Sequence, residues 1–376
     1  MDRIENYIEM LMKESTPDYP AWNIEKKRLG LKSKWNYIDG CMIKAILEMY
    51  GITNDKKYLE FADNFIDAKV FEDGTIDGYD VNEKNIDNVN AGKTLFELYD
   101  ITGKEKYRKA IDLIYSQIKD MPRTKEGSFW HKNIYPEQVW LDGLYMAQPF
   151  YMEYETRYNN KANYPDIFGQ FIRVKAHMKD ERSGLYYHAY DDSKQMFWAD
   201  KVTGLSSHFW LRALGWFSMA LLDTMDVCQD KDAPEYKVMM GMFTDLMDAM
   251  LKYQDESGMW YQVVNLGGMD RNYLETSGSS IMAYALLKGV RLGYLPSSYK
   301  EYGVKAFKGV TDKYLTEDEK GGIHLDGICL VAGLGGDSRR PGTYDYYMSE
   351  PIVCDDAKGV GPYLLAYTEM RRAGEI

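Results

Sequence analysis

The chain has 376 residues and a formal net charge of −12, with 45% hydrophobic and 28% charged residues. This composition is ordinary for a globular protein with a sizeable core, and the acidic balance without a basic stripe excludes a nucleic-acid-binding protein. No apolar run reaches the length of a membrane span, and the acidic N-terminal stretch "MDRIENYIEMLMKES" lacks the apolar region of a signal peptide. We therefore expect neither a nucleic-acid nor a membrane partner.

Aromatic residues are frequent, at 14% of the chain with 32 Tyr and 8 Trp. This surplus suits a protein that binds sugars, although a large core also consumes aromatic side chains. Four cysteines, Cys41, Cys228, Cys329 and Cys354, are far apart and form no CxxC motif, which is typical of reduced thiols. A cytoplasmic enzyme fits these observations best.

Hydrophobic periodicity predicts twelve helices. In chain order they span residues 3–13, 36–50, 55–68, 86–100, 104–118, 137–157, 161–178, 208–226, 233–252, 276–292, 297–314 and 356–372. Four of them are apolar on most faces and should be inner helices: 36–50, 137–157, 208–226 and 276–292. Four others carry a polar stripe and should be outer helices: 55–68, 104–118, 161–178 and 233–252.

A weak internal repeat supports this alternation. "YGITNDKKYLEFADNF" from Tyr50 and "YDITGKEKYRKAIDLI" from Tyr99 share Tyr, Ile, Thr, Lys and Tyr at matching positions. In each copy an apolar helix leads through a short turn into a more charged helix, which is the pattern of a helical hairpin.

Glycine-aromatic loops recur between the predicted hairpins. They are "GTID" at Gly74, "GSFWH" at Gly127, "GLYYH" at Gly184, "GMWYQ" at Gly258 and "GIHLD" at Gly322. One such loop per hairpin would form a common rim. We therefore predict an all-α fold, an (α/α)6 barrel of six inner and six outer helices, as one catalytic domain over residues 1–376. The alternative is an open α-solenoid, whose repeats normally lack such long aromatic loops.

Asp142 is the first candidate for chemistry, because it stands alone among aromatic and aliphatic residues in "QVWLDGLYMAQPFYMEYE". A first-turn helix acid after Pro136 is the structural explanation, but that explains an exposed aspartate better than a flanked one. Apolar surroundings favour the protonated form that a general acid requires, whereas the helix N-terminus favours the ionised form. A second carboxylate nearby would help to keep Asp142 protonated.

Arg212 is the only charge between His208 and Asp223 in "SSHFWLRALGWFSMALLD". The spacing of His208, Arg212 and Trp216 predicts that they share one helix face. A buried guanidinium needs an anion. This anion is either an Asp or Glu elsewhere in the barrel, as a structural ion pair, or a substrate carboxylate held by the planar guanidinium. In the second case Trp210 or Trp216 would offer a stacking face for a sugar.

Four further residues have weaker signals. Asp87, in "NEKNIDNVNAGKTLFELYD", most resembles a helix-capping or first-turn acid. His131 and His188 close two of the glycine-aromatic loops, and their matching positions favour a shared site as much as two unrelated polar side chains. Tyr37 lies at the entry of an inner helix, where core packing and ligand contact are equally compatible with the sequence.

Several chemistries are excluded. Five histidines without an HExxH motif or a Cys–His cluster predict no zinc site. The acidic run "DGTIDGYDVNEK" lacks the final glutamate of an EF-hand, "AGLGGDS" matches no phosphate-binding fingerprint, and no GxSxG is present. We expect no metal and no cofactor.

Five segments together resemble the unsaturated rhamnogalacturonyl hydrolases of glycoside hydrolase family 105, and more distantly the unsaturated glucuronyl hydrolases of family 88. They are "IDNVNAGKTLFELYDITG", "GSFWHKNIYPEQVWLDGLYMAQPFYMEY", "HFWLRALGWFSMALLD", "NYLETSGSSIMAYALLKGVRLGYL" and "YYMSEPIVCDDAKGVGPYLLA". Their order extends from about residue 35 to residue 370. The resemblance implies an (α/α)6 barrel and a substrate with a 4,5-unsaturated uronic acid at its non-reducing end, left by a pectin lyase.

The resemblance also implies the reaction. An aspartic acid protonates C4, water adds at C5, and the resulting hemiketal opens and releases the aglycone, so the usual two-carboxylate rule for glycosidases does not apply. By matching positions, Asp142 is the general acid/base and Asp87 is the second acidic residue of the site. The residues implied to bind the sugar are His188, Trp210, Arg212 and Trp216, followed less securely by Tyr37, His131 and Lys132.

One departure from the family pattern is Leu214, which stands where many members have a polar residue, so it bears on the preference for the aglycone. We expect a hydrolase of lyase-generated rhamnogalacturonan oligosaccharides. The alternatives are an unsaturated glucuronyl hydrolase that acts on another lyase product, and a non-catalytic sugar-binding barrel, which the presence of both Asp87 and Asp142 disfavours. A barrel isomerase or epimerase would require more histidines at the inner rim.

Overall fold

Six buried helices form a closed ring at the centre of the computed structural model, which describes residues 3–376. They are α3 (Tyr37–Thr53), η2 with α5 (Ile86–Gly92 and Lys93–Thr102), α7 (Leu141–Tyr158), α9 (Leu211–Val227), α11 (Thr276–Arg291) and α14 (Ala357–Arg372). Each contacts the next, and α14 returns to contact α3. This closure confirms the (α/α)6 barrel and contradicts the open solenoid.

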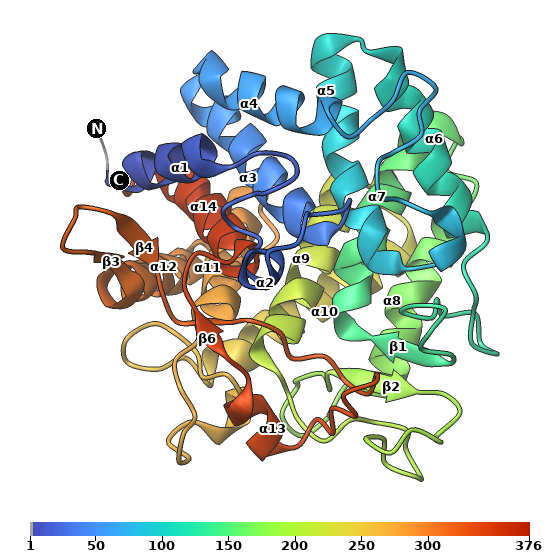
Figure 1. The fold of residues 1–376 in the computed structure, drawn as a ribbon. Coiled ribbons are helices and arrows are strands. Elements are labelled where there is room, and N and C mark those ends of the chain that lie inside the picture. Colours follow the sequence, from blue (N-terminus) through green and yellow to red (C-terminus); the bar gives the residue numbers. More distant parts are fainter. Residues whose placement is uncertain (1–2) are drawn as a thin grey trace.

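Six amphipathic helices form the outer layer. They are α1 (Arg3–Glu14), α4 (Lys56–Asp67), α6 (Glu105–Lys119), α8 (Tyr164–Met178), α10 (Pro234–Leu251) and α12 (Lys300–Tyr314). The N-terminal helix α1 lies beside the C-terminal helix α14 (Figure 1), where Glu5 and Arg371 form an ion pair of 2.9 Å. The first and last helices thus meet at the seam of the barrel.

All twelve predicted helices are present, but three of the inner ones begin differently. The helices predicted from 137 and 208 begin at Leu141 and Leu211, because extended residues precede them. Before α7, β1 (Gln138–Trp140) pairs antiparallel with β2 (Ala189–Asp191), and before α9, Trp210 bridges to Val263. The helix predicted at 86–100 begins as the 3-10 helix η2. These corrections concern the ends of inner helices at the rim.

The remaining elements are short. They are α2 (Ile24–Leu29), α13 (Tyr344–Ser349), η1 (Val81–Glu83), η3 (Val264–Leu266), η4 (Ser297–Tyr299), β3 (Leu315–Glu317), β4 (Ile323–Leu325), β5 (Ile328–Cys329) and β6 (Ile352–Val353). β3 pairs antiparallel with β4, and β5 with β6. Within residues 3–376, no helix combines the length and apolar character that crossing a bilayer requires.

The core lies between the two helical layers. Phe171 of α8 packs against Phe217 of α9, with ring centroids 6.3 Å apart, and Phe307 of α12 stacks on Tyr363 of α14 at 5.1 Å. All four side chains are buried. Burial of each contributes about 1.5–3 kcal/mol, so this interlayer packing holds the inner ring in place.

Connections with extended backbone gather at one end of the barrel, where β1 and β2 lie side by side and α13 lies in the lower part of Figure 1. Two of the predicted glycine-aromatic loops turn through Gly127 and Gly184, whose φ angles of +97° and +79° favour glycine. Each turn leads back toward the ring and ends at a histidine, His131 or His188. The repeat in the sequence therefore marks equivalent positions around one rim.

Candidate active site

A cavity of about 240 Å³ opens at this end of the barrel. Its walls come from the first turns of inner helices and from the loops before them. It is lined by all nine residues predicted for the site: Asp142, Asp87, His188, Trp210, Arg212, Trp216, Tyr37, His131 and Lys132. The barrel thus brings together residues that are spread over half the sequence.

Asp142 lies in the first turn of α7. The backbone N–H of Leu141 donates to the carbonyl of His188 at 3.0 Å, which joins the start of α7 to the loop that carries His188. Asp142 Oδ2 is 3.5 Å from His188 Nε2, and both atoms are buried without a hydrogen-bond partner within residues 3–376. Buried polar atoms rarely stay unpaired, so this pair is open to a ligand or water.

His188 is oriented from its other nitrogen. Its Nδ1 lies 2.7 Å from the hydroxyl of Tyr347, and both side chains are fully buried. A partner on one ring nitrogen selects the tautomer and the orientation of the other. Tyr347, on α13, therefore aims His188 Nε2 at Asp142.

Asp87 is held as a carboxylate. It lies in the first turn of η2, where Ile86 N–H donates to the carbonyl of His131, and this contact places the side chains of His131 and Lys132 beside it. Asp87 Oδ2 lies 2.7 Å from Lys132 Nζ, and Oδ1 lies 3.3 Å from His131 Nε2. Burial raises the pKa of Asp87, but Lys132 and His131 outweigh it and hold the pKa well below its usual range. The expected second carboxylate is present, but Lys132 neutralises its charge.

His131 packs directly against the start of α7. A Cβ atom at Gly143 would lie only 2.9 Å from His131 Nδ1, so glycine permits this close approach. Trp140 is sandwiched between the rings of His131 and Tyr135, at centroid distances of 4.6 and 5.1 Å. One wall of the cavity is therefore a stack of flat rings.

Arg212 is 2% exposed and has no carboxylate within ion-pair distance in the described residues. Its Nη1 donates to Ser277 Oγ at 3.2 Å and to the carbonyl of Cys329, and its Nη2 donates to the carbonyl of Leu330 at 3.4 Å. Arg212 therefore forms no direct ion pair within the described residues and is anchored by neutral oxygens, although the buried acids Glu275 and Asp356 interact with it electrostatically. No hydrogen bond within residues 3–376 occupies its Nε, so Nε and Nη2 can together bind a carboxylate.

Two tryptophans form the opposite aromatic surface. Trp210 Nε1 donates to Gln262 Oε1 at 3.1 Å, and Arg212 lies over its ring at 4.6 Å. Trp216 stacks on Tyr145, with centroids 5.0 Å apart and planes at 7°. Oriented indole faces of this kind suit the apolar face of a pyranose ring.

Two sequence-based expectations near Arg212 are corrected. His208 does not share a helix face with Arg212, because α9 begins only at Leu211 and His208 belongs to the preceding extended segment. Leu214 is fully buried and does not line the cavity. The departure at Leu214 therefore has no direct contact with a bound sugar.

Sequence reasoning missed part of the lining. The missed residues are Glu25, Tyr135, Trp140, Met146, Val331, Ala332, Gly333 and Arg340. Several come from the connection between β5 and α13, whose glycine-rich "AGLGGDS" was considered only as a phosphate loop. Its glycines and arginines were the available signal for a loop at a ligand site.

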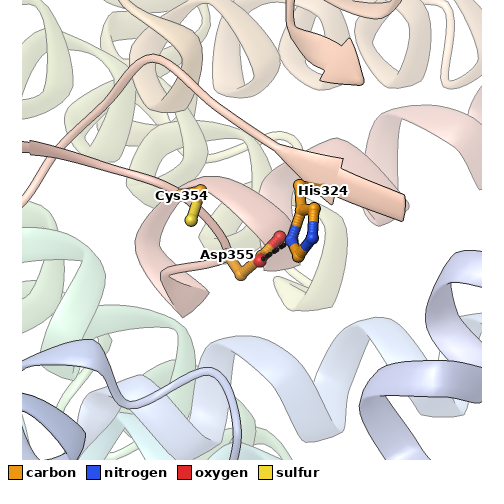
Figure 2. Close-up of side chains that lie close together, drawn as sticks. All are labelled: His324, Cys354 and Asp355. Carbon is orange, nitrogen blue, oxygen red and sulfur yellow. Dashed lines mark hydrogen bonds and ion pairs between the residues drawn. The ribbon is translucent and has the colours of Figure 1, made fainter. Parts of the chain in front are cut away.

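A His–Cys–Asp group lies outside this cavity. The ligand atoms of His324, Cys354 and Asp355 lie within 4.8 Å of one another, so the sequence-based exclusion of a Cys–His cluster was wrong. In Figure 2 the Asp355 carboxylate reaches the His324 ring, while Cys354 stands apart from this pair. A 2.6 Å contact joins His324 Nδ1 to Asp355 Oδ2, and Asp355 Oδ1 accepts from Tyr7 and from Leu325 N–H. These contacts link α1 and β4 to the segment that leads into α14.

Residues 7–373 match the sequence profile described as Glycosyl Hydrolase Family 88. A solved glycoside hydrolase of family 105 from C. acetobutylicum ATCC 824 is 47% identical, with a TM-score of 0.89, over 97% of this chain and 99% of that one. Protein Atu3128 of Agrobacterium fabrum is 39% identical over 230 residues, 60% of this chain and 97% of that protein. The unsaturated rhamnogalacturonyl hydrolase YesR of Bacillus subtilis is 26% identical over 295 residues, 77% of this chain and 79% of YesR.

Proposed function

Because the chain belongs to the glycoside hydrolases of families 88 and 105, we propose that it releases 4,5-unsaturated uronic acid from lyase-generated rhamnogalacturonan oligosaccharides. One observation carries this proposal: Asp142 Oδ2 is buried without a hydrogen-bond partner in the described residues. It lies in a cavity that has aromatic walls and is also lined by Arg212, which has no ion-pair partner there. The name of the Bacillus subtilis relative favours rhamnogalacturonan as the source. All four cysteines are free thiols, which suits a cytoplasmic site of action.

In the proposed reaction, Asp142 is protonated at the start. Its proton adds to C4 of the unsaturated sugar, and a water oxygen adds to C5 while the water proton returns to Asp142. The C4–C5 double bond is consumed and a hemiketal forms at C5. Ring opening gives a ketone at C5 and leaves C1 with one hydroxyl and the aglycone, which then departs as an alcohol.

The remaining residues hold the sugar for this proton transfer. Arg212 offers its free Nε and Nη2 to the C6 carboxylate, next to the carbon that water attacks. Trp210 and Trp216 offer flat faces to the ring. His188, aimed by Tyr347, lies close enough to Asp142 to orient its carboxyl group or the attacking water.

Asp87 has a second role in this scheme. Its carboxylate is kept ionised by Lys132, so it can accept a hydrogen bond from a sugar hydroxyl or from water but cannot donate a proton. This arrangement assigns the acid to Asp142 and a positioning function to Asp87.

The test follows the ultraviolet absorbance of the unsaturated uronide. Wild-type protein should abolish the absorbance of an unsaturated rhamnogalacturonan disaccharide, and Asp142→Asn should not. Asp112→Asn, a change at an exposed ion pair with Arg108, is the matched control and should keep full activity. Persistent absorbance with wild-type protein on every unsaturated uronide would refute the proposal. Turnover of an unsaturated glucuronide alone would reassign the substrate to another lyase product.

A further inference from the structure

Two guanidinium groups line the cavity without a carboxylate partner in the described residues, although the proposed reaction explains only one of them. Arg212 is the first. Arg340, from the loop between β5 and α13, is the second, and it is less buried. Its Nε donates to Gly335 O at 3.1 Å, and its Nη2 contacts Leu334 O at 3.4 Å and the Tyr135 hydroxyl at 3.3 Å. No hydrogen bond within residues 3–376 occupies Nη1.

Other charged groups of the cavity already have ion-pair partners. Lys132 pairs with Asp87 at 2.7 Å, and Glu25 pairs at 3.0 Å with Lys358, which also pairs with Asp356 at 3.0 Å. Asp142 is neutral when it carries the proton that the reaction uses. Arg212 and Arg340 therefore remain as lining cations without an ion pair in the described residues, whereas the unsaturated uronic acid brings one carboxylate.

Glu350 interacts electrostatically with both arginines, and the acids Glu275 and Asp356 also act on Arg212. No ion pair joins Glu350 to Arg340 or Arg212 in the described chain, and it does not line the cavity. Burial raises the pKa of Glu350 above its usual value, although both arginines oppose this effect. The cavity therefore has room for a second external anion.

Resting on the proposed function, we propose that Arg340 recognises an acidic group on the aglycone, either a uronate carboxylate or a sulfate ester. Arg212 is deep and buried, so it takes the carboxylate of the unsaturated sugar. Arg340 lies at the rim, where the ring stack of Trp140 and Tyr135 leads outward from the catalytic pair. A sugar chain leaving the cavity along this stack would bring its next charged group to Nη1.

A purely structural role for Arg340 makes a different prediction. Its bonds to Gly335 and Leu334 hold its own loop, so a structural arginine would affect all substrates equally. The two roles are therefore separated by comparing substrates with neutral and acidic aglycones, not by activity alone.

The experiment measures kcat/KM for two pairs of substrates. The first pair is the unsaturated rhamnogalacturonan disaccharide, whose aglycone is neutral, and the tetrasaccharide, which adds an internal galacturonate. The second pair is an unsaturated chondroitin disaccharide without and with a sulfate ester. We expect the acidic aglycone of at least one pair to be preferred about tenfold, as befits a charged hydrogen bond. The pair that shows it distinguishes carboxylate from sulfate.

Three variants test the assignment. Arg340→Gln should reduce the preference to about one, whereas Arg339→Gln should keep it, because Arg339 is exposed and stacks on Phe197. Tyr135→Phe removes the hydroxyl beside Arg340 without removing the positive charge of Arg340, so it should keep the preference. This variant tests whether the position of the loop, and not the charge of Arg340, determines the preference.

The inference is overturned if wild-type protein shows no preference in either pair. It is also overturned if the preference survives in Arg340→Gln, or if Tyr135→Phe abolishes it as completely as Arg340→Gln does. Cleavage of neutral substrates without any preference leaves the proposed function intact and removes only this inference. Absence of cleavage on every unsaturated substrate removes both.

Discussion

His188 Nε2 lies 3.5 Å from Asp142 Oδ2, and neither buried atom has a hydrogen-bond partner within residues 3–376. The backbone contact between Leu141 and His188 holds the two together, so this spacing is a property of the fold. After a small shift of the two side chains, a water molecule or a substrate group could form hydrogen bonds with both atoms. The following predictions start from this pair.

His188→Asn should lower kcat about 10- to 100-fold, because Asp142 loses the group that orients it or the attacking water. His208→Asn is the matched control, since His208 is near Tyr347 but does not line the cavity. Steady-state kinetics on one unsaturated disaccharide should show the loss only in the first variant. Equal losses in both would point to general disturbance of the rim.

Lys132→Met should shift the pH dependence of activity. Lys132 is the largest charge that lowers the pKa of Asp87, so its removal raises that pKa and moves the acidic limb of the pH–rate profile to higher pH. An unchanged acidic limb would show that Asp87 does not need to be ionised.

The same variant should lose stability in a pH-dependent way. A carboxylate with a lowered pKa stabilises the folded state above the unfolded value of about 4, and this contribution is lost as pH falls through the folded value. Lys132→Met should therefore lose about 1–3 kcal/mol at neutral pH and less below pH 4. Denaturant unfolding at both pH values measures the difference.

Arg212→Lys should raise KM about tenfold or more, because an ammonium keeps the charge but cannot present the fork to a carboxylate. Some stability is also lost with the bonds to Ser277 and Cys329. Arg123→Lys is the control. Arg123 makes a bidentate hydrogen bond to Asp166, with distances of 2.7 and 2.8 Å, and this pair does not line the cavity. That variant should lower the melting temperature without changing KM.

Tyr145→Leu should raise KM several-fold, because Tyr145 supports Trp216 from behind the sugar-binding face. Lys93 Nζ lies 3.5 Å above the other side of Tyr145, and burial lowers the pKa of Lys93 to about 8. Phe307→Leu disrupts a comparable stack with Tyr363 far from the site. Phe307→Leu should lower stability about as much as Tyr145→Leu does, without changing KM. If Phe307→Leu raised KM as much as Tyr145→Leu does, the role of Tyr145 would be contradicted.

His324→Gln should remove a pH-dependent part of stability. The hydrogen bond that His324 donates to Asp355 raises the pKa of His324, so its stabilisation is complete below the unfolded value of about 6.5 and is lost as pH rises through the folded value. The loss should be under about 1 kcal/mol at pH 6 and smaller at pH 9. The same loss of stability at both pH values would contradict the ion pair.

A separate measurement tests metal binding by His324, Cys354 and Asp355. A rise in melting temperature of the wild-type protein on adding Zn²⁺ would show that this group binds metal.

The helices were largely predictable, because burial leaves a local signature in an amphipathic or fully apolar periodicity. Helix starts were less predictable, because the apolar pairs Val139–Trp140 and Phe209–Trp210 fit either a helix or a strand. Pairing of β1 with β2 decides between them, and its partner lies some fifty residues away in the chain.

The sequence also singled out Asp142 and Arg212, because a lone charge in an apolar segment is visible without knowing its neighbours. It could not show how each charge is balanced. Asp87 is neutralised by Lys132, Arg212 has only neutral partners, and Arg340 enters the cavity from a distant loop.

By itself, the sequence determined the alternation of inner and outer helices, the rim of glycine-aromatic loops and the identity of the isolated charges. The tertiary structure alone decided which charges meet, which stay unpaired and which aromatic faces turn toward the cavity. The physical reason is that periodicity and burial are local properties of a segment, whereas electrostatic balance depends on distances set by closing the ring from α14 back to α3.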